Sequence, residues 1–67
     1  MKIDNKKLEI VMATRCISLK ELSKRSSISE VTLTRLKRNA QKPKPQTIGK
    51  IAKALNCNVI EIIETEN

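Results

Sequence analysis

The sequence predicts a small all-α domain, and three observations support that prediction. Apolar residues recur along the 67-residue chain with a helical period. A single glycine and two prolines leave little room for hairpins. Phenylalanine, tyrosine and tryptophan are absent from the sequence, so aliphatic side chains must form the core. Because a chain of this length buries only a thin core, we expect one domain over residues 1–67.

The first helix is predicted over residues 5–15, where Asp4 or Asn5 can act as the N-cap. The spacing i, i+3, i+4, i+7 gives this helix one mostly apolar stripe. The residues of the stripe are Leu8, Val11, Met12 and Arg15.

The second helix is predicted to begin at Ser18 and to end near Arg25. Ser18 and Glu21 have the S-x-x-E spacing of a capping box, in which each side chain satisfies a free backbone amide of the other residue. Ile17 precedes the cap and can pack on Leu22 as a hydrophobic staple. Two serines then form the turn.

The third helix is predicted to begin after its cap, Ser29, and to run to about Arg38. Leu33 and Leu36 point inward, and Asn39 suits a left-handed helix stop because asparagine tolerates positive φ. The residues that remain on the outward face are Glu30, Val31, Thr34, Arg35 and Arg38.

A basic loop over residues 40–44 precedes a fourth helix, in which Pro45 suits the first position and Asn56 the end. Asn58 caps a short fifth helix, and Glu61 completes an N-x-x-E variant of the capping box. This segment holds more apolar residues than one small helix can hide on one face: Val59, Ile60, Ile62 and Ile63.

The chain is strongly basic, and its charge is unevenly distributed. Fourteen Lys and Arg face seven Asp and Glu, which gives a net charge of +7. All the cations lie within residues 1–57, whereas the last ten residues carry three glutamates and no cation. A basic body indicates a polyanionic partner, either nucleic acid or an anionic membrane surface. Charge alone also fits a solvated surface that keeps a small protein in solution.

The residue types present argue against several other classes of protein. Cys16 and Cys57 are isolated and the chain has no histidine, so we expect no metal site, no redox pair and no cofactor. Both cysteines are interpreted as small buried hydrophobes in a reducing compartment. No apolar run is long enough for a signal peptide or membrane span, so we expect a cytoplasmic protein. Without a Cys–His pair, a glycine-rich phosphate loop or a close carboxylate pair, no enzyme is predicted.

Two strings, ISLKELSKRSSISEVTLTRLKRN and PQTIGKIAKALNCNVIEII, resemble the lambda-repressor-like, Cro/XRE-type helix-turn-helix family. The resemblance covers roughly residues 6–64. It implies a five-helix DNA-binding domain with the helix-turn-helix at about residues 18–39 and a recognition helix at residues 29–38 that enters the major groove. The implied protein is a sequence-specific transcriptional regulator, expected to be a repressor of phage, mobile-element or bacterial origin.

The resemblance also implies which side chains meet DNA. Arg35 can donate two hydrogen bonds to guanine, and Glu30 can accept one from cytosine or simply stabilise the first helical turn. The implied base-contacting residues are Ser29, Glu30, Val31, Thr34 and Arg35. The implied phosphate-contacting residues are Ser18, Lys20, Arg38, Lys42 and Lys44.

The sequence departs from the family pattern at five positions. Ser23 replaces the usual alanine of the second helix, and Ser27 replaces the usual glycine of the turn. Cys16 replaces a glycine that is common after the first helix. Met12 and Lys37 occupy the positions of an Arg–Glu ion pair that is frequent in the family, so neither partner of that pair is kept, and we propose that Met12 packs under the aliphatic stem of Lys37.

The expected partners are double-stranded DNA and a second copy of the chain, with no membrane and no small-molecule ligand. The isoleucines of the fifth helix are assigned to the dimer interface: Ile60, Ile62 and Ile63. A two-fold dimer would bind half-sites about 34 Å apart, and the acidic tail after Ile63, which ends in residues 65–67, would lie away from the DNA. Two alternatives remain open: an antitoxin that binds DNA and a toxin protein, and a protein-interaction adaptor that does not bind DNA.

Overall fold

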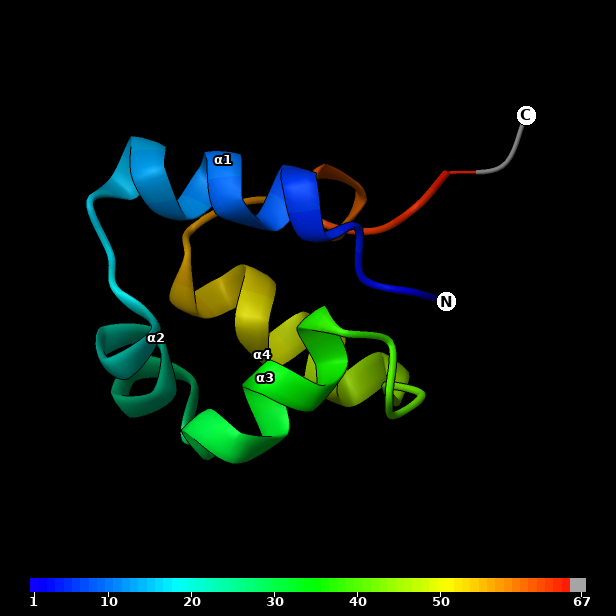
Figure 1. Ribbon diagram of the computed structural model, residues 1–67. Helices are drawn as coiled ribbons and strands as arrows, with labels where there is room; N and C mark the ends of the chain where they lie inside the picture. Colours follow the sequence, from blue (N-terminus) through cyan, green and yellow to red (C-terminus); the bar gives the residue numbers. More distant parts are fainter. Residues whose placement is uncertain (66–67) are drawn as a thin grey trace.

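The computed structural model describes residues 1–65 and contains four α-helices followed by one 3-10 turn (Figure 1). In chain order they are α1 (Asn5–Arg15), α2 (Leu19–Ser26), α3 (Glu30–Lys37), α4 (Pro45–Ala54) and η1 (Val59–Glu61). The all-α prediction is confirmed, and each element begins within a residue of its predicted start. Residues 66 and 67 of the predicted tail lie outside the described residues.

The predicted fifth helix is instead the 3-10 turn η1. The amide of Glu61 donates to the carbonyl of Asn58, and the amide of Ile62 donates to that of Val59, each at 3.0 Å. Bonds between residues three apart define a 3-10 helix. The predicted capping box between Asn58 and Glu61 is present, but beyond Ile62 the chain leaves helical geometry to pair with the N-terminal segment. The five-helix expectation is therefore corrected to four helices and a turn.

The N-terminal segment forms an antiparallel bridge with the chain after η1. The amide of Asp4 donates to the carbonyl of Ile62, and the amide of Glu64 donates to that of Lys2, each at 2.9 Å. Ile3 lies between these bonds and is 1% exposed. It therefore belongs to the core, although the helical pattern from which the core was predicted begins only at α1.

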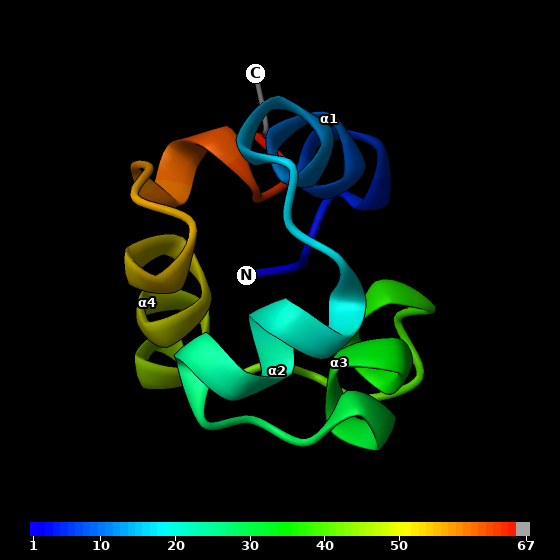
Figure 2. The same cartoon turned by 90° about the vertical axis from the view of Figure 1, so that its left-hand side faces the viewer.

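The core lies among the four helices and η1. Helix α2 packs on both α3 and α4, and η1 packs on both α1 and α4 (Figure 2). The largest fully buried side chains are all aliphatic, as the composition requires: Ile3, Leu8, Leu22, Leu33, Leu36, Ile48, Ile51, Leu55 and Ile62. Within residues 1–65, none of the helices is long and apolar enough to cross a membrane.

Side-chain caps begin the first three helices where the sequence predicts them. The carboxylate of Asp4 accepts from the Lys7 amide, and the hydroxyls of Ser18 and Ser29 accept from amides three residues ahead, all at 3.1 Å. The α2 capping box is only half made, because the carboxylate of Glu21 pairs with Arg25 of the same helix.

Every helix is followed by a residue with a left-handed backbone, although none of these residues is glycine. Their φ angles are 56° at Cys16, 60° at Ser27, 57° at Asn39 and 54° at Asn56. The helix stop predicted at Asn39 is confirmed. Asparagine adopts this conformation readily, whereas for most other residues the left-handed conformation costs roughly 1–2 kcal/mol. Cys16 and Ser27 therefore keep the backbone shape for which the family uses glycine.

The side chain of Arg15, at the end of α1, forms hydrogen bonds to the backbone at the end of α4. Its Nε donates to the carbonyl of Leu55 and its Nη2 to the carbonyl of Asn56, both at 3.0 Å. Leu55 is the C-cap of α4, so its carbonyl lacks a partner within the helix, and Asn56 is the residue that follows it. A guanidinium at a helix C-terminus also meets the negative end of the helix dipole. One side chain thus joins two helices through a hydrogen bond between residues 40 positions apart in sequence.

Candidate nucleic-acid interface

Helix α3 is anchored by the two leucines that the sequence predicts to point inward. Leu33 is 1% exposed and Leu36 is 2% exposed. Val31, on the opposite side of the same helix, is 62% exposed. Figure 2 shows α3 at the edge of the molecule with α2 against its inner side. The outward side of α3 is therefore clear of the protein body.

The predicted base-contacting residues share that outward side, with qualifications at Thr34 and Ser29. Glu30, Val31 and Arg35 are exposed, and Thr34 is partly buried. Ser29 is exposed, but its hydroxyl donates to the hydroxyl of Thr32 at 2.9 Å and accepts the Thr32 amide at 3.1 Å. Because its proton is already used within the helix cap, Ser29 can offer a base only an acceptor lone pair.

The turn between α2 and α3 is fixed by two serine hydroxyls. Ser23 Oγ donates to the carbonyl of Ile28 at 2.6 Å. Ser26 Oγ donates to the carbonyl of Leu22 at 2.7 Å and accepts the amide of Ile28 at 3.3 Å. From the sequence, Ser23 was interpreted only as a small replacement for alanine, and its hydrogen bond across the turn was not predicted. The signal was the pair of serines three residues apart, directly before a turn without glycine.

An ion pair fixes the other end of α3. Lys37 Nζ lies 3.7 Å from Glu9 Oε1 of α1. The family's pair at positions 12 and 37 is not kept, but a different ion pair joins the two helices, with the acid on α1 and the base on α3. Glu9 lies one helical turn before Met12, which is why a position-by-position comparison with the family missed it. Met12 itself is buried, at 8% exposure.

The predicted phosphate-contacting residues are exposed, and they border α2, α3 and the loop before α4. Arg38 follows α3, Lys42 lies in the loop, and Lys44 occupies the N-cap position of α4. Ser18 and Lys20 lie at the N-terminus of α2, where backbone amides add hydrogen-bond donors. Among residues 1–65 the only ion pairs are Arg25–Glu21 and Lys37–Glu9. The predicted phosphate-contacting cations therefore form no ion pair within the described residues.

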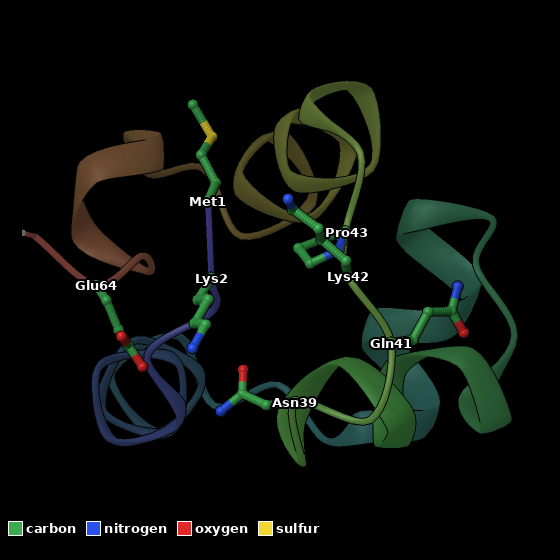
Figure 3. Close-up of a pocket in the computed structure, with 7 residues that line it drawn as sticks. All are labelled: Met1, Lys2, Asn39, Gln41, Lys42, Pro43 and Glu64. Carbon is green, nitrogen blue, oxygen red and sulfur yellow. The ribbon is translucent and has the colours of Figure 1, made fainter.

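A hollow of about 580 Å³ lies beside the basic loop (Figure 3). Its lining residues are Met1, Lys2, Asn39, Gln41, Lys42, Pro43 and Glu64. Glu64 and Lys42 thus border the same hollow. The acidic tail after Ile63 was expected to lie away from DNA, and its first glutamate, Glu64, lies near the basic loop.

The isoleucines assigned to a dimer interface do not share one surface. Ile62 is fully buried in the core of the single chain, so a second subunit cannot reach it, and this assignment is corrected. Ile63 is partly buried and bridges Ile3, which leaves Ile60 at 62% exposure. Ile10 of α1 is 64% exposed and was missed, because it lies outside the apolar stripe of its helix.

The two cysteines differ from each other. Cys16 is exposed, so its interpretation as a buried hydrophobe is wrong: the left-handed position after α1 places it at the surface. Cys57 is partly buried, and this burial raises the pKa of its thiol, with a smaller contribution from the Glu61 carboxylate. Within the described part of the chain, no group of three His, Cys, Asp or Glu comes together to hold a metal ion.

Comparison with known proteins agrees with this geometry. A search of the curated proteins found no match to the chain. The family model described as "Cro/C1-type HTH DNA-binding domain" matches residues 7–67, which include all of α2, α3, α4 and η1. Proteins with this domain bind DNA and are typically not enzymes. The chain therefore belongs to the Cro/C1-type helix-turn-helix (XRE) family of DNA-binding domains.

Proposed function

We propose that this protein is a sequence-specific transcriptional regulator that represses by occupying an operator, with the recognition helix, residues 29–38, in the major groove. One observation carries the proposal: Leu33 and Leu36 hold α3 by one side, so its polar side stands clear of the body. A helix presented in this way fits the width of the major groove of B-DNA. The net charge of +7 supplies the attraction to the duplex.

In this proposal the side chains on the outward side of α3 contact the edges of the bases directly. Arg35 donates two parallel hydrogen bonds to O6 and N7 of one guanine, and Val31 contacts a thymine methyl group. Glu30 accepts from the amino group of cytosine, and Thr34 offers its hydroxyl to a base or phosphate. Ser29 contributes as an acceptor only, because its hydroxyl already donates its hydrogen bond to the hydroxyl of Thr32. This division makes Arg35 the main source of sequence preference.

Backbone contacts set the register of the helix on the duplex. They come from the two ends of the helix-turn-helix and from the loop that follows it. The proposed phosphate-contacting residues are Ser18, Lys20, Arg38, Lys42 and Lys44.

A two-fold dimer follows from the apolar residues that the fold leaves uncovered away from α3. Lys7 Nζ of α1 reaches the carbonyl of Ile60 at 3.5 Å, so α1 and η1 lie together there. Ile10 follows Lys7 by three residues and lies on the same side of α1. We therefore propose Ile10 and Ile60, with the edge of Ile63, as the dimer contact. The dimer would bind palindromic half-sites about 34 Å apart.

Selection from random duplexes, followed by sequencing of the retained DNA, tests this function. We expect enrichment of one palindromic motif whose two halves are separated by one turn of the DNA helix. Enrichment of DNA without any common motif would contradict sequence-specific regulation. If no duplex is retained even at low salt, the chain is an adaptor and not a DNA-binding regulator. The polar and basic outward side of α3 argues against that alternative.

A further inference from the structure

The hollow beside the basic loop brings Lys2, near the start of the chain, close to Lys42 of the α3–α4 loop. Lys2 and Glu64 border it on one wall, and residues of the α3–α4 loop border the other (Figure 3). The backbone of Lys2 is held in position although the residue lies near the start of the chain. Its carbonyl accepts the Glu64 amide at 2.9 Å, and the next residue, Ile3, is buried. The backbone that carries the Lys2 ammonium is therefore anchored.

The chemistry of the lining fits an anion that accepts several hydrogen bonds. Lys2 and Lys42 supply two ammonium groups, and the side-chain amides of Asn39 and Gln41 supply further donors. Glu64 is the one acidic residue in the lining, so the hollow lacks the oxygen cluster that a divalent cation needs. Pro43 is buried and holds the loop against the body.

We propose that this hollow binds a phosphodiester of the DNA backbone, that Lys2 is a further phosphate contact from outside the helix-turn-helix, and that Glu64 opposes this contact. The proposal rests on the proposed function, because it assumes that the loop carrying Lys42 borders the duplex. Isolated surface ammonium groups hold a free anion weakly, but a duplex already bound by α3 presents its phosphates at high local concentration. Glu64 repels the phosphate and attracts the lysines, so it weakens binding without regard to sequence.

Salt-dependent binding to a random-sequence duplex tests the proposal. The variants are Lys2→Gln, Lys42→Gln and, as a control with the same loss of charge, Lys53→Gln, whose side chain is exposed on α4 outside this hollow. Loss of one phosphate contact lowers the slope of log K against log salt by roughly one, and at about 0.1 M salt it weakens binding by about fivefold to tenfold. We expect this loss in the Lys2 and Lys42 variants and a smaller loss with an unchanged slope in the control.

Glu64→Gln supplies the second arm of the test. We expect it to strengthen binding to the same duplex in the native chain, and to lose most of that effect when combined with Lys2→Gln. A Lys2→Gln slope equal to that of the Lys53→Gln control would overturn the inference while leaving the proposed function intact. If the native chain binds no duplex at low salt, the proposed function itself fails. Because the substituted side chains are all exposed, we expect each variant to fold as the native chain does, and circular dichroism checks this.

Discussion

The hydroxyl of Ser23 donates a 2.6 Å hydrogen bond to the carbonyl of Ile28, across the turn that joins α2 to α3. Helices α1, α3 and α4 each end with an amide bonded to the carbonyl five residues back, the pattern of a Schellman motif. At the end of α2 the corresponding amide, that of Ile28, bonds to Ser26 Oγ instead. Serine hydroxyls thus close the turn on which the angle of α3 depends.

Replacing Ser23 by alanine, the residue usual in the family, should therefore destabilise this protein. The substitution removes a hydrogen bond from a partly buried carbonyl, which typically costs about 1 kcal/mol. The free energy of unfolding, from urea titration, measures the loss. Exposed Thr14, whose hydroxyl bonds only to Ile10 of its own helix, provides the control, and Thr14→Ala should change the free energy much less. Equal effects would contradict a special role for the turn.

Ser27→Gly should stabilise the protein. Glycine removes the left-handed strain at φ 60°, worth roughly 1–2 kcal/mol. Part of that gain is lost because glycine increases the entropy of the unfolded chain. We expect a net gain of about 0.5–1 kcal/mol. Asn39→Gly is the matched control with a similar φ, and it should gain less because asparagine already tolerates this conformation. Thermal unfolding that ranks the two variants in the opposite order would show that Ser27 is not strained.

Local signals explain why so much of this fold is predictable from the sequence. A cap such as Ser18 or Ser29 acts on amides within three residues, so the sequence window that contains it also contains its partner. Long-range contacts carry no such signal. The Arg15 bond to Leu55 and the pairing of Ile3 with Ile63 depend on where distant segments arrive.

The errors at the candidate site have the same origin. Ile62 was assigned to a dimer surface because one small helix cannot hide all the isoleucines of this segment on one face, but the chain leaves helical geometry there and buries Ile62. The outward side of α3 was predictable because it follows from Leu33 and Leu36 through the helical period alone.

Arg15→Met should destabilise the protein by about 1–3 kcal/mol. It removes two charge-assisted hydrogen bonds to the carbonyls of Leu55 and Asn56, at the end of α4. Arg25→Met is the control: Arg25 forms an exposed ion pair with Glu21, and such pairs contribute about 0–1 kcal/mol. Chemical denaturation compares the two variants. A loss at Arg15 no larger than that at Arg25 would mean that the link between α1 and α4 adds nothing to stability.

Ile60→Asp should weaken dimer formation without unfolding the chain, because the side chain is 62% exposed in the single subunit. A carboxylate at the centre of an apolar contact must lose its hydration without gaining a partner. Val31→Asp is a matched control, since Val31 is equally exposed but lies on the recognition side of α3. Sedimentation equilibrium should show a weaker dimer only for the Ile60 variant. A native chain that stays monomeric, or equal behaviour of the two variants, would remove this interface.

The most direct test of the central claim, that the free side of α3 reads bases, compares Arg35→Ala with Arg38→Ala on the selected duplex and on its single-base-pair variants. Arg35→Ala should cost about 1–3 kcal/mol of binding free energy and abolish the preference at one G·C pair. Arg38→Ala should weaken binding to all the duplexes by a similar factor, because it removes a phosphate contact. If Arg35→Ala keeps the full preference of the native chain at every position, α3 does not read DNA in the way proposed.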